Sequence, residues 1–258
     1  MKRLSRDRGI AAVILFLMIN TVFVFQQASA KEVNIYLIRH GKTLFNTTGQ
    51  VQGWSDSPLT ASGIKQAEQA GKGLKDIVFT TVYSSDSGRA RETAKLILQN
   101  NRAEVKPELT ELKALREWGY GSYEGRDDAS LWEPLFSSQQ IEFKKDWSTW
   151  EQFTRKMSDR DIADAIARND KSGMAENYNA IVMRLKKGIH EIIKETEAKG
   201  GGNSLVVSHG SAIPTILTLF APEQYQGESI DNVSLSVLHY DEGKFTLTKL
   251  GDTDYLPQ

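Results

Sequence analysis

Short apolar segments alternate along the chain with segments in which apolar residues recur every three or four positions. The first kind predicts buried strands, and the second kind predicts helices that pack one face on a core. The predicted strands are 33–38, 80–84, 203–207, 233–240 and 245–251. The predicted helices are 60–75, 88–99, 178–193 and 212–220, the first with Thr60 as its N-cap. Strands and helices that alternate in this way indicate an α/β domain.

Residues 126–174 break this alternation. The segment is rich in Asp, Lys, Ser and Gln, yet it contains six large aromatic residues, which disordered linkers rarely have. We therefore expect a helical insertion, called the insertion below, that forms a cap over the edge of the sheet. Its aromatic side chains either pack against one another, which we favour, or line a binding pocket. They are Trp132, Phe136, Phe143, Trp147, Trp150 and Phe153.

The first 30 residues differ from the rest of the chain. Four basic residues lie within the first eight positions, an apolar run covers 10–25, and an Ala-Ser-Ala triplet occupies 28–30. This order is typical of a secretory signal peptide cleaved after Ala30, which leaves a mature domain of residues 31–258. The alternative is an uncleaved membrane anchor, because the run is only slightly shorter than the roughly 20 residues that span a bilayer. We expect a secreted, periplasmic or cell-surface protein, in contact with a membrane only if this segment is retained.

Removal of the first 30 residues changes the charge of the protein. The chain has 32 Lys and Arg and 33 Asp and Glu, of which this segment holds four and one, so the mature chain carries a net charge of about −4. Such a surface lacks the positive field of a dedicated nucleic-acid-binding protein. The chain has no cysteine, which excludes disulfides and thiol chemistry. The stability of the exported domain must therefore come from its core.

Two of the four histidines lie between a predicted strand and a glycine. His40 and His209 each follow a predicted buried strand and each precede a glycine, whereas His190 and His239 do not. Ligands of open α/β sheets bind outside the carboxyl ends of the strands. We therefore expect His40 and His209 to face one ligand site.

Groups that bind anions are predicted at the same edge of the sheet. Arg39 precedes His40, Asn46 lies shortly after the first strand, and Arg89 opens the helix that follows the second strand. The planar fork of arginine and the free N–H groups at a helix start both bind phosphate oxygens. Two arginines, two histidines, an amide and helix N-termini therefore indicate an anion site that suits phosphate.

Glu117 is the best candidate for a proton donor. It lies in a glycine-rich turn beside the aromatic residues Trp118 and Tyr120. Partial burial beside aromatic side chains raises the pKa of a carboxyl group toward the working range of a general acid. Most glutamates are solvated, so it is the context of this turn that singles out Glu117.

These blocks together resemble the histidine phosphatase superfamily, whose best-known branch contains the cofactor-dependent phosphoglycerate mutases. The resemblance extends from residue 33 to the last predicted strands. An Arg-His-Gly triplet alone is a weak signal, but five ordered blocks with fitting separations are a strong one. The blocks are Arg39-His40-Gly41-Lys42-Thr43 with Asn46, Gly53-Trp54 with 58–63, Ser84-Ser85 with 89–94, Glu117 with Gly121 and Glu124-Gly125, and Ser208-His209-Gly210.

The resemblance implies a three-layer α/β/α sandwich with a mostly parallel central sheet and a helical cap. It implies that His40 is the nucleophile and forms a phosphohistidine, and that Glu117 protonates the leaving alkoxide and then activates water. Neither a metal nor another cofactor is expected, because two arginines supply the positive charge. The residues expected to hold the phosphoryl group are Arg39, Asn46, Arg89, His209 and Gly210, and of these Arg39, Arg89 and His209 also count as catalytic.

The sequence favours a phosphatase over a mutase. A mutase needs further cations for the carboxylate of its substrate, but Trp-Gly-Tyr at 118–120 stands where the mutase branch has an arginine after the catalytic glutamate. Residues 210–214 resemble those of phosphatase members, although Pro214 replaces a frequent arginine and leaves the substrate contacts open. We expect a small phosphorylated substrate.

Two other classes of function stay open. A non-catalytic module would use the pocket to recognise a phosphorylated ligand, but such modules usually lose the nucleophile or the acid, and His40, Glu117 and His209 are all present. A metal site on the two histidines lacks a close-spaced set of His and carboxylate ligands. Neither an oligomeric state nor a particular ester follows from these patterns.

Overall fold

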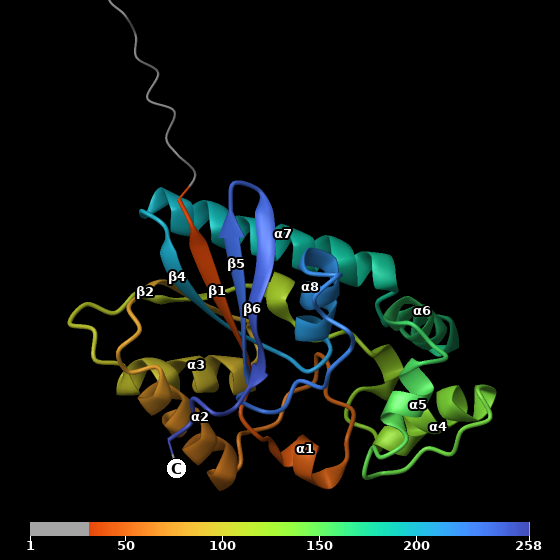
Figure 1. Ribbon diagram of the computed structural model, residues 1–258. Coiled ribbons are helices and arrows are strands. Elements are labelled where there is room, and N and C mark those ends of the chain that lie inside the picture. The colour runs from red at the N-terminus through yellow and green to blue at the C-terminus, as the bar shows by residue number, and fades with distance from the viewer. Residues whose placement is uncertain (1–30, 258) are drawn as a thin grey trace, which may run out of the picture.

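The computed structural model describes residues 31–257, and the predicted signal peptide lies outside the described residues. Six strands form one sheet in the order β3-β2-β4-β1-β5-β6 (Figure 1). All five predicted strands are present, and the three-residue edge strand β3 is too short to give a periodic signal. The strands are β1 (Val33–Arg39), β2 (Phe79–Ser84), β3 (Leu109–Glu111), β4 (Gly202–Ser208), β5 (Leu235–Asp241) and β6 (Lys244–Asp252).

The sheet is mostly parallel, as predicted. The first four strands are parallel and pair as β3 with β2, β2 with β4, and β4 with β1. Strand β5 pairs antiparallel with β1, and β6 pairs antiparallel with β5. The register aligns Arg39 at the end of β1 with Ser208 at the end of β4. His40 and His209, the next residues along the chain, therefore leave the sheet side by side at its carboxyl edge.

Helices cover both faces of the sheet and confirm the three-layer α/β/α architecture. Side chains alternate along β1, so Ile35 and Leu37 join the core beneath α7 and α8, while Ile38 joins the core beneath α2 and α3. Figure 1 shows α2 and α3 side by side, well separated from α7. These helices are α2 (Ala61–Gly73), α3 (Gly88–Asn100), α7 (Tyr178–Ala198) and α8 (Ala212–Phe220).

Local sequence signals set the helix ends. Thr60 is the N-cap of α2, as predicted, and its side chain accepts a hydrogen bond from Gly63 N over 3.1 Å. Helix α7 continues past the periodic residues 178–193 to Ala198, just before the three glycines predicted to end it. Three glycines with positive φ at 200–202 follow it, and they let the chain turn away from the helix.

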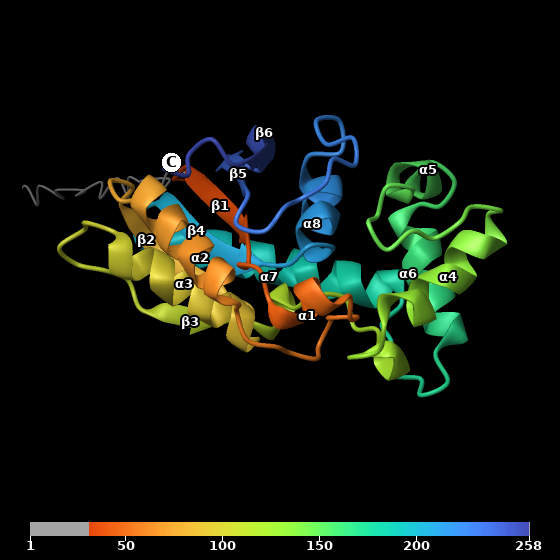
Figure 2. The same ribbon diagram turned by 90° about the horizontal axis from the view of Figure 1, so that it is seen from below.

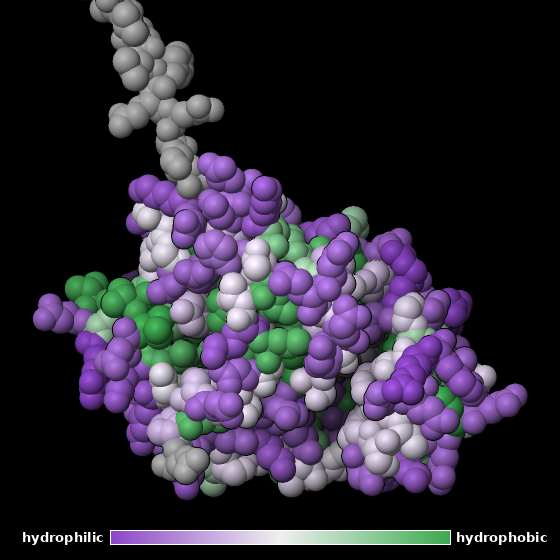
Figure 3. All heavy atoms as spheres, viewed as in Figure 1, coloured by the Kyte–Doolittle hydropathy of each residue, from purple (hydrophilic) through white to green (hydrophobic). Residues whose placement is uncertain are grey.

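The insertion contains three helices, and two of them, α4 and α5, share a small aromatic core with the loop between them. Phe136 stacks on Phe153 with ring centroids 4.0 Å apart, and Trp132 meets Trp150 edge-on at 5.3 Å. Figure 2 shows the three helices grouped at one end of the molecule, and their surface in Figure 3 is mostly hydrophilic to neutral. The aromatic residues therefore serve packing within the insertion, the interpretation we favoured. The helices are α4 (Asp128–Ser138), α5 (Trp150–Thr154) and α6 (Asp159–Asn169).

Short helical elements near the sheet edge escaped prediction from the sequence. Helix α1 (Leu44–Thr48) begins with a capping box in which the side chains of Thr43 and Asn46 bond each other's backbone N–H groups. Two 3₁₀ turns cover Lys113–Leu115 and Gly121–Tyr123. Within residues 31–257, none of the helices combines the length and the apolar character that a bilayer span requires.

Candidate active site

The two histidines predicted to share a site lie in contact at the carboxyl edge of β1 and β4. Their ring centroids are 5.2 Å apart, and the exposed fractions are 3% for His40 and 0% for His209. The other two histidines lie elsewhere, since His190 is exposed on α7 and His239 on β5 bonds Asn34. The structure thus brings together the pair that the sequence singled out.

One ring nitrogen of His40 makes no hydrogen bond to any of the described residues. A carbonyl oxygen only accepts hydrogen bonds, so His40 Nδ1 donates to the carbonyl oxygen of Gly41 over 2.9 Å. Burial, together with the positive charges of Arg89 and Arg39, holds the pKa of His40 well below its usual value. The ring is therefore neutral with its lone pair on Nε2, the form that acts as a nucleophile.

Both ring nitrogens of His209 are engaged. A guanidinium only donates, so Arg89 Nη2 donates to His209 Nδ1 over 3.0 Å, and His209 Nε2 donates to Ser85 Oγ over 2.7 Å. Burial and the charge of Arg89 hold the pKa of His209 well below its usual value, and the ring is neutral. The predicted contact of His209 with a phosphoryl oxygen stays a prediction, because such a contact requires one of these two hydrogen bonds to change.

Arg39 lies flat against Gly210. A Cβ added to Gly210 would lie 3.1 Å from Arg39 Cζ, so a glycine is the residue that lets the backbone approach the guanidinium this closely. Arg39 Nη1 donates to the carbonyl oxygen of Ile230 over 2.8 Å, which fixes the side chain at the site. Gly210 therefore shapes the site through its lack of a side chain.

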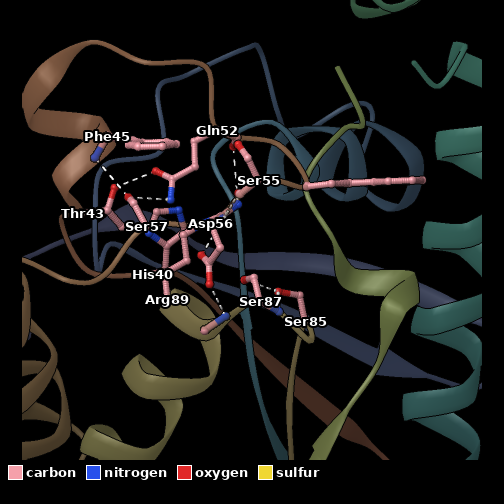
Figure 4. Close-up of polar contacts among 12 residues, drawn as sticks. His40, Thr43, Phe45, Gln52, Ser55, Asp56, Ser57, Ser85, Ser87 and Arg89 are labelled. Atoms are coloured by element: carbon pink, nitrogen blue, oxygen red, sulfur yellow. Dashed lines mark hydrogen bonds and ion pairs between the residues drawn. The ribbon is translucent and has the colours of Figure 1, made fainter. Parts of the chain in front are cut away.

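Arg89, in the first turn of α3, also holds the loop that covers the site (Figure 4). Its Nη1 donates to Ser55 O and to Asp56 Oδ1, both over 2.9 Å, and its Nη2 donates to Gly53 O over 2.8 Å. Asp56 Oδ2 accepts from Gly88 N at the start of the same helix over 2.6 Å. Asp56 was not among the predicted site residues, although its acidic side chain beside the Gly53-Trp54 block was a usable signal.

Two buried N–H groups of the arginines next to the paired histidines lack a hydrogen-bond partner among the described residues. They are Nε of Arg39 and Nε of Arg89, and Nε of Arg91 in the pocket lining is a third such group. A buried donor without a partner costs about 1–3 kcal/mol, so this pair indicates that an acceptor belongs here. Phosphoryl oxygens are strong acceptors for arginine. This is the clearest structural sign of the predicted anion site.

Asn46 lies at the rim of the site and shares a partner with His40. Asn232, from the loop before β5, donates from Nδ2 to the carbonyl oxygen of His40 over 2.8 Å and to Asn46 Oδ1 over 3.4 Å. Asn46 Oδ1 also accepts from Thr43 N, so its own Nδ2 is the group that can face a ligand. Asn232 was missed because nothing in its local pattern distinguishes it from other loop amides.

Glu117 caps the start of α8 with its carboxylate. Oε2 accepts from Ser211 N over 2.8 Å, and Oε1 accepts from Ala212 N and Trp118 N, both over 2.9 Å. Burial raises the pKa of Glu117, as predicted, while these backbone N–H groups and the nearby arginines oppose the rise. The side chain is buried and its carboxyl group lies where α8 begins, two residues after His209.

A pocket of about 230 Å³ opens beside Glu117 and His209. Its two arginines are both paired with carboxylates, Arg116 with Asp86 over 2.6 Å and Arg91 with Glu111 over 3.2 Å. Among residues 31–257, no three histidine or carboxylate side chains are grouped as a metal site requires. Among the described residues, the insertion contributes no side chain to the lining of this pocket. The lining residues are Gly53, Trp54, Asp56, Asp86, Ser87, Gly88, Arg91, Arg116, Glu117 and His209.

Comparisons with known proteins agree with this geometry. The family model of the histidine phosphatase superfamily (branch 1) matches residues 35–253. The broad-specificity phosphatase YOR283W of Saccharomyces cerevisiae is 28% identical over 230 residues, which cover 87% of each chain. The probable phosphoglycerate mutase GpmB of Escherichia fergusonii is 30% identical over 218 residues, which cover 83% of this chain and 87% of that protein.

Solved structures show the same fold. The phosphoglycerate mutase of Bacillus anthracis is similar with a TM-score of 0.80 and 34% identity, over 90% of this chain and 98% of that chain. The alpha-ribazole phosphatase of Shigella flexneri has a TM-score of 0.61 at 24% identity, over 85% and 96% of the two chains, and shares the fold. The match over residues 35–253, together with the paired histidines and arginines at the sheet edge, establishes that the chain belongs to branch 1 of the histidine phosphatase superfamily.

Proposed function

We propose that this chain is an exported phosphomonoesterase that hydrolyses a small phosphate ester through a phosphohistidine on His40. Nε2 of His40 attacks phosphorus, the bond from phosphorus to the ester oxygen breaks, and Glu117 gives its proton to the leaving alkoxide. Glu117 then takes a proton from water, whose oxygen attacks the phosphohistidine and restores neutral His40. The net reaction consumes one water and yields one alcohol and one inorganic phosphate.

The observation that carries this proposal is a free nucleophile beside arginine N–H groups that have no hydrogen-bond partner among the described residues. His40 is neutral with Nε2 free, and the buried Nε groups of Arg39 and Arg89 lack partners among the described residues. Fixed donors of this kind stabilise the charge that spreads over the transferring phosphoryl oxygens. Positioning and electrostatics then supply most of the rate enhancement.

The surroundings of Glu117 suit both of its proposed protonation states. Burial raises its pKa and favours the protonated acid that must meet the leaving alkoxide. Once the proton has left, the N–H groups of Trp118, Ser211 and Ala212 stabilise the carboxylate. The same carboxylate is then ready to accept a proton from the attacking water.

The pocket supports a phosphatase rather than a mutase. A phosphoglycerate carries a carboxylate that needs a free cation, but each arginine of the pocket lining already lies beside a carboxylate. Arg116 is hydrogen-bonded to Asp86, and Arg91 forms a looser ion pair with Glu111. A neutral, polar leaving group fits such a lining better than an anionic one. The indole of Trp54 adds an apolar wall at the rim.

Phosphoglycerate mutase activity is the second candidate, because the Bacillus anthracis mutase and the GpmB proteins are among the most similar proteins. The two candidates differ in the group that receives the phosphoryl group from His40. In a phosphatase it is water, and in a mutase it is a second oxygen of the bound acid.

The experiment that separates the candidates measures both activities on the full-length chain. Release of inorganic phosphate is followed over a panel of sugar phosphates, nucleotides, phosphoglycerates and phosphopeptides, with interconversion of phosphoglycerates assayed alongside. We expect hydrolysis that His40→Ala abolishes and that His190→Ala, at the exposed histidine of α7, leaves unchanged. Mutase activity above hydrolysis would favour the second candidate, and phosphate binding without turnover would favour a non-catalytic module.

Export rests on the order of residues 1–30 and is tested separately. Expression in a bacterial host, followed by osmotic release and N-terminal sequencing, should recover a chain that begins at Lys31. A full-length chain in the membrane fraction would indicate an anchor, and a full-length chain in the cytosol would contradict export.

A further inference from the structure

The segment that carries Glu117 has little regular structure. One 3₁₀ turn covers Lys113–Leu115, and the chain passes through Glu117 to a second turn at Gly121–Tyr123. Buried carbonyl groups in such a segment have no strand or helix partner, so side chains must satisfy them. The side chains that do so determine how the main chain of Glu117 is oriented.

Arg184, on α7, supplies three of these hydrogen bonds. Its Nη1 donates to the carbonyl oxygens of Ala114 over 3.1 Å and Arg116 over 2.7 Å. Its Nη2 donates to the carbonyl oxygen of Glu117 over 2.8 Å, which also accepts from Trp54 Nε1 over 3.1 Å. The rigid, planar guanidinium of Arg184 therefore holds most of the backbone of residues 114–117 in place.

Glu176 holds Arg184 in this position. Its Oε1 accepts from Arg184 Nε and its Oε2 from Arg184 Nη2, both over 2.7 Å. Oε2 also accepts from Gly119 N over 3.0 Å, so the pair holds the chain on both sides of Glu117. The exposed fractions of the two side chains are 17% and 11%, which places the pair largely inside the protein.

We propose that Arg184, held by Glu176, is a positioning residue for Glu117, a role that rests on the proposed function of Glu117 as proton donor. Arg184 does not line the pocket, and its charge is paired with that of Glu176. Its charge still contributes to the lowered pKa of His209, after burial and the charges of Arg89 and His40. Its direct contacts near the site are with the main chain of residues 114–117, and through these it acts on Glu117. The carboxyl group of Glu117 bonds Ser211 N and Ala212 N at the start of α8, so the residue is held both at its main chain and at its carboxyl group.

The test uses two esters that differ in their need for a proton donor. Glycerol 2-phosphate has a poor leaving group, and 4-nitrophenyl phosphate has a good one. For the full-length chain we expect Arg184→Ala to lower kcat/KM for glycerol 2-phosphate roughly 30-fold and for 4-nitrophenyl phosphate less than about threefold, because a displaced acid harms only the leaving group that needs its proton. Equal slowing of both esters would overturn the inference.

Arg160→Ala is the matched control. Arg160 is an exposed arginine that packs on Tyr178 at the start of the same helix and is not among the groups that bond residues 114–117. We expect it to leave both rates within about twofold, as is usual for surface substitutions. Selective slowing of glycerol 2-phosphate by Arg160→Ala as well would count against a specific role of Arg184.

A double-variant cycle tests whether Arg184 acts through Glu117. In a Glu117→Gln chain no proton donor is left to position, so adding Arg184→Ala should lower kcat/KM for glycerol 2-phosphate by no more than about twofold. Independent, additive losses would overturn the inference.

Glu176→Gln keeps the shape of the Glu176 side chain and removes the negative charge that is paired with Arg184. This variant should also slow glycerol 2-phosphate more than 4-nitrophenyl phosphate, but by a smaller factor than Arg184→Ala. If Arg184→Ala does not fold, the absence of that selectivity in Glu176→Gln overturns the inference on its own.

Failure of this inference and failure of the proposed function give different results. If the wild-type chain hydrolyses no ester, the proposed function fails and the inference fails with it. If the wild-type chain is active and Glu117→Gln selectively slows glycerol 2-phosphate while Arg184→Ala does not, only the inference fails.

Discussion

Arg89 Nη2 donates a hydrogen bond to His209 Nδ1 over 3.0 Å, and this contact determines the tautomer of the second histidine. The proton of His209 then lies on Nε2, where Ser85 Oγ accepts it, whereas the proton of His40 lies on Nδ1. The two neighbouring imidazoles therefore carry opposite tautomers. Of these two rings, His40 is the one with a ring nitrogen that no described residue bonds, so the hydrogen bonds distinguish the proposed nucleophile from its partner.

The first prediction concerns the covalent intermediate. Rapid quenching of the full-length chain with a phosphate ester under alkaline conditions should trap a phosphoenzyme that acid destroys, since the bond between phosphorus and a histidine nitrogen is acid-labile. Mass spectrometry should locate the phosphoryl group on His40. A phosphoryl group on His209 would contradict the assignment of His40 as the nucleophile. If turnover is confirmed but no phosphoenzyme is found, no covalent intermediate accumulates.

The second prediction concerns the proton donor. Glu117→Gln should lower kcat for an alkyl phosphate about 100-fold or more, and for 4-nitrophenyl phosphate less than about tenfold, because 4-nitrophenolate leaves without protonation. Glu191→Gln, at an exposed position of α7, serves as the control and should leave both rates unchanged. A loss of the same size for both esters would remove Glu117 from the role of donor.

The third prediction concerns the close approach of Gly210 to Arg39. The Cβ of Gly210→Ala would lie 3.1 Å from Arg39 Cζ, so the guanidinium must move by a few tenths of an ångström. We expect KM for a phosphate ester to rise about tenfold and inhibition by inorganic phosphate to weaken in parallel, because small displacements of a binding group are costly. Thermal unfolding should change little. Unchanged phosphate affinity would show that the guanidinium does not contact the phosphoryl group.

The fourth prediction concerns stability at acidic pH. The pKa values of His40 and His209 are lowered well below 6.5 in the folded protein, so below about pH 6.5 the unfolded chain binds protons that the folded chain does not. The contribution of each of these histidines to stability should therefore fall as the pH decreases from 6.5, by up to about 1.4 kcal/mol per pH unit. Denaturant titrations at several pH values should show a smaller loss for His40→Asn than for the wild type. His190→Asn, which alters an exposed histidine, should follow the wild type.

The sequence predicted the parts of the molecule that rest on hydrophobic pattern and chain order. The strands that end at Arg39 and Ser208 are short and have an apolar centre, and parallel pairing brings their carboxyl ends together. This is why His40 and His209 could be assigned to one site from their contexts alone. Thr60 was recognised for a similar reason, since an N-cap acts on residues close to it in sequence.

The contacts that the sequence did not reveal join side chains to distant backbone. Asn232 bonds the carbonyl oxygen of His40, and Arg184 bonds three carbonyls before and at Glu117. Such contacts depend on the path of two loops or of a loop and a helix, and they leave no periodic trace in the residues around either partner. The opposite tautomers of the two histidines likewise follow from Gly41, Ser85 and Arg89 only once these are placed in space.

The alignment of β1 with β4 has a consequence for how activity arises during folding. These adjacent strands pair residues 169 positions apart in the chain, such as Asn34 and Asn203. Closing a loop of that length is entropically costly, so this pairing is expected late in folding. The proposed active site therefore cannot form until most of the polypeptide is present and β4 has docked beside β1. Recovery of the proposed hydrolysis after dilution from denaturant would then report the completion of the central sheet.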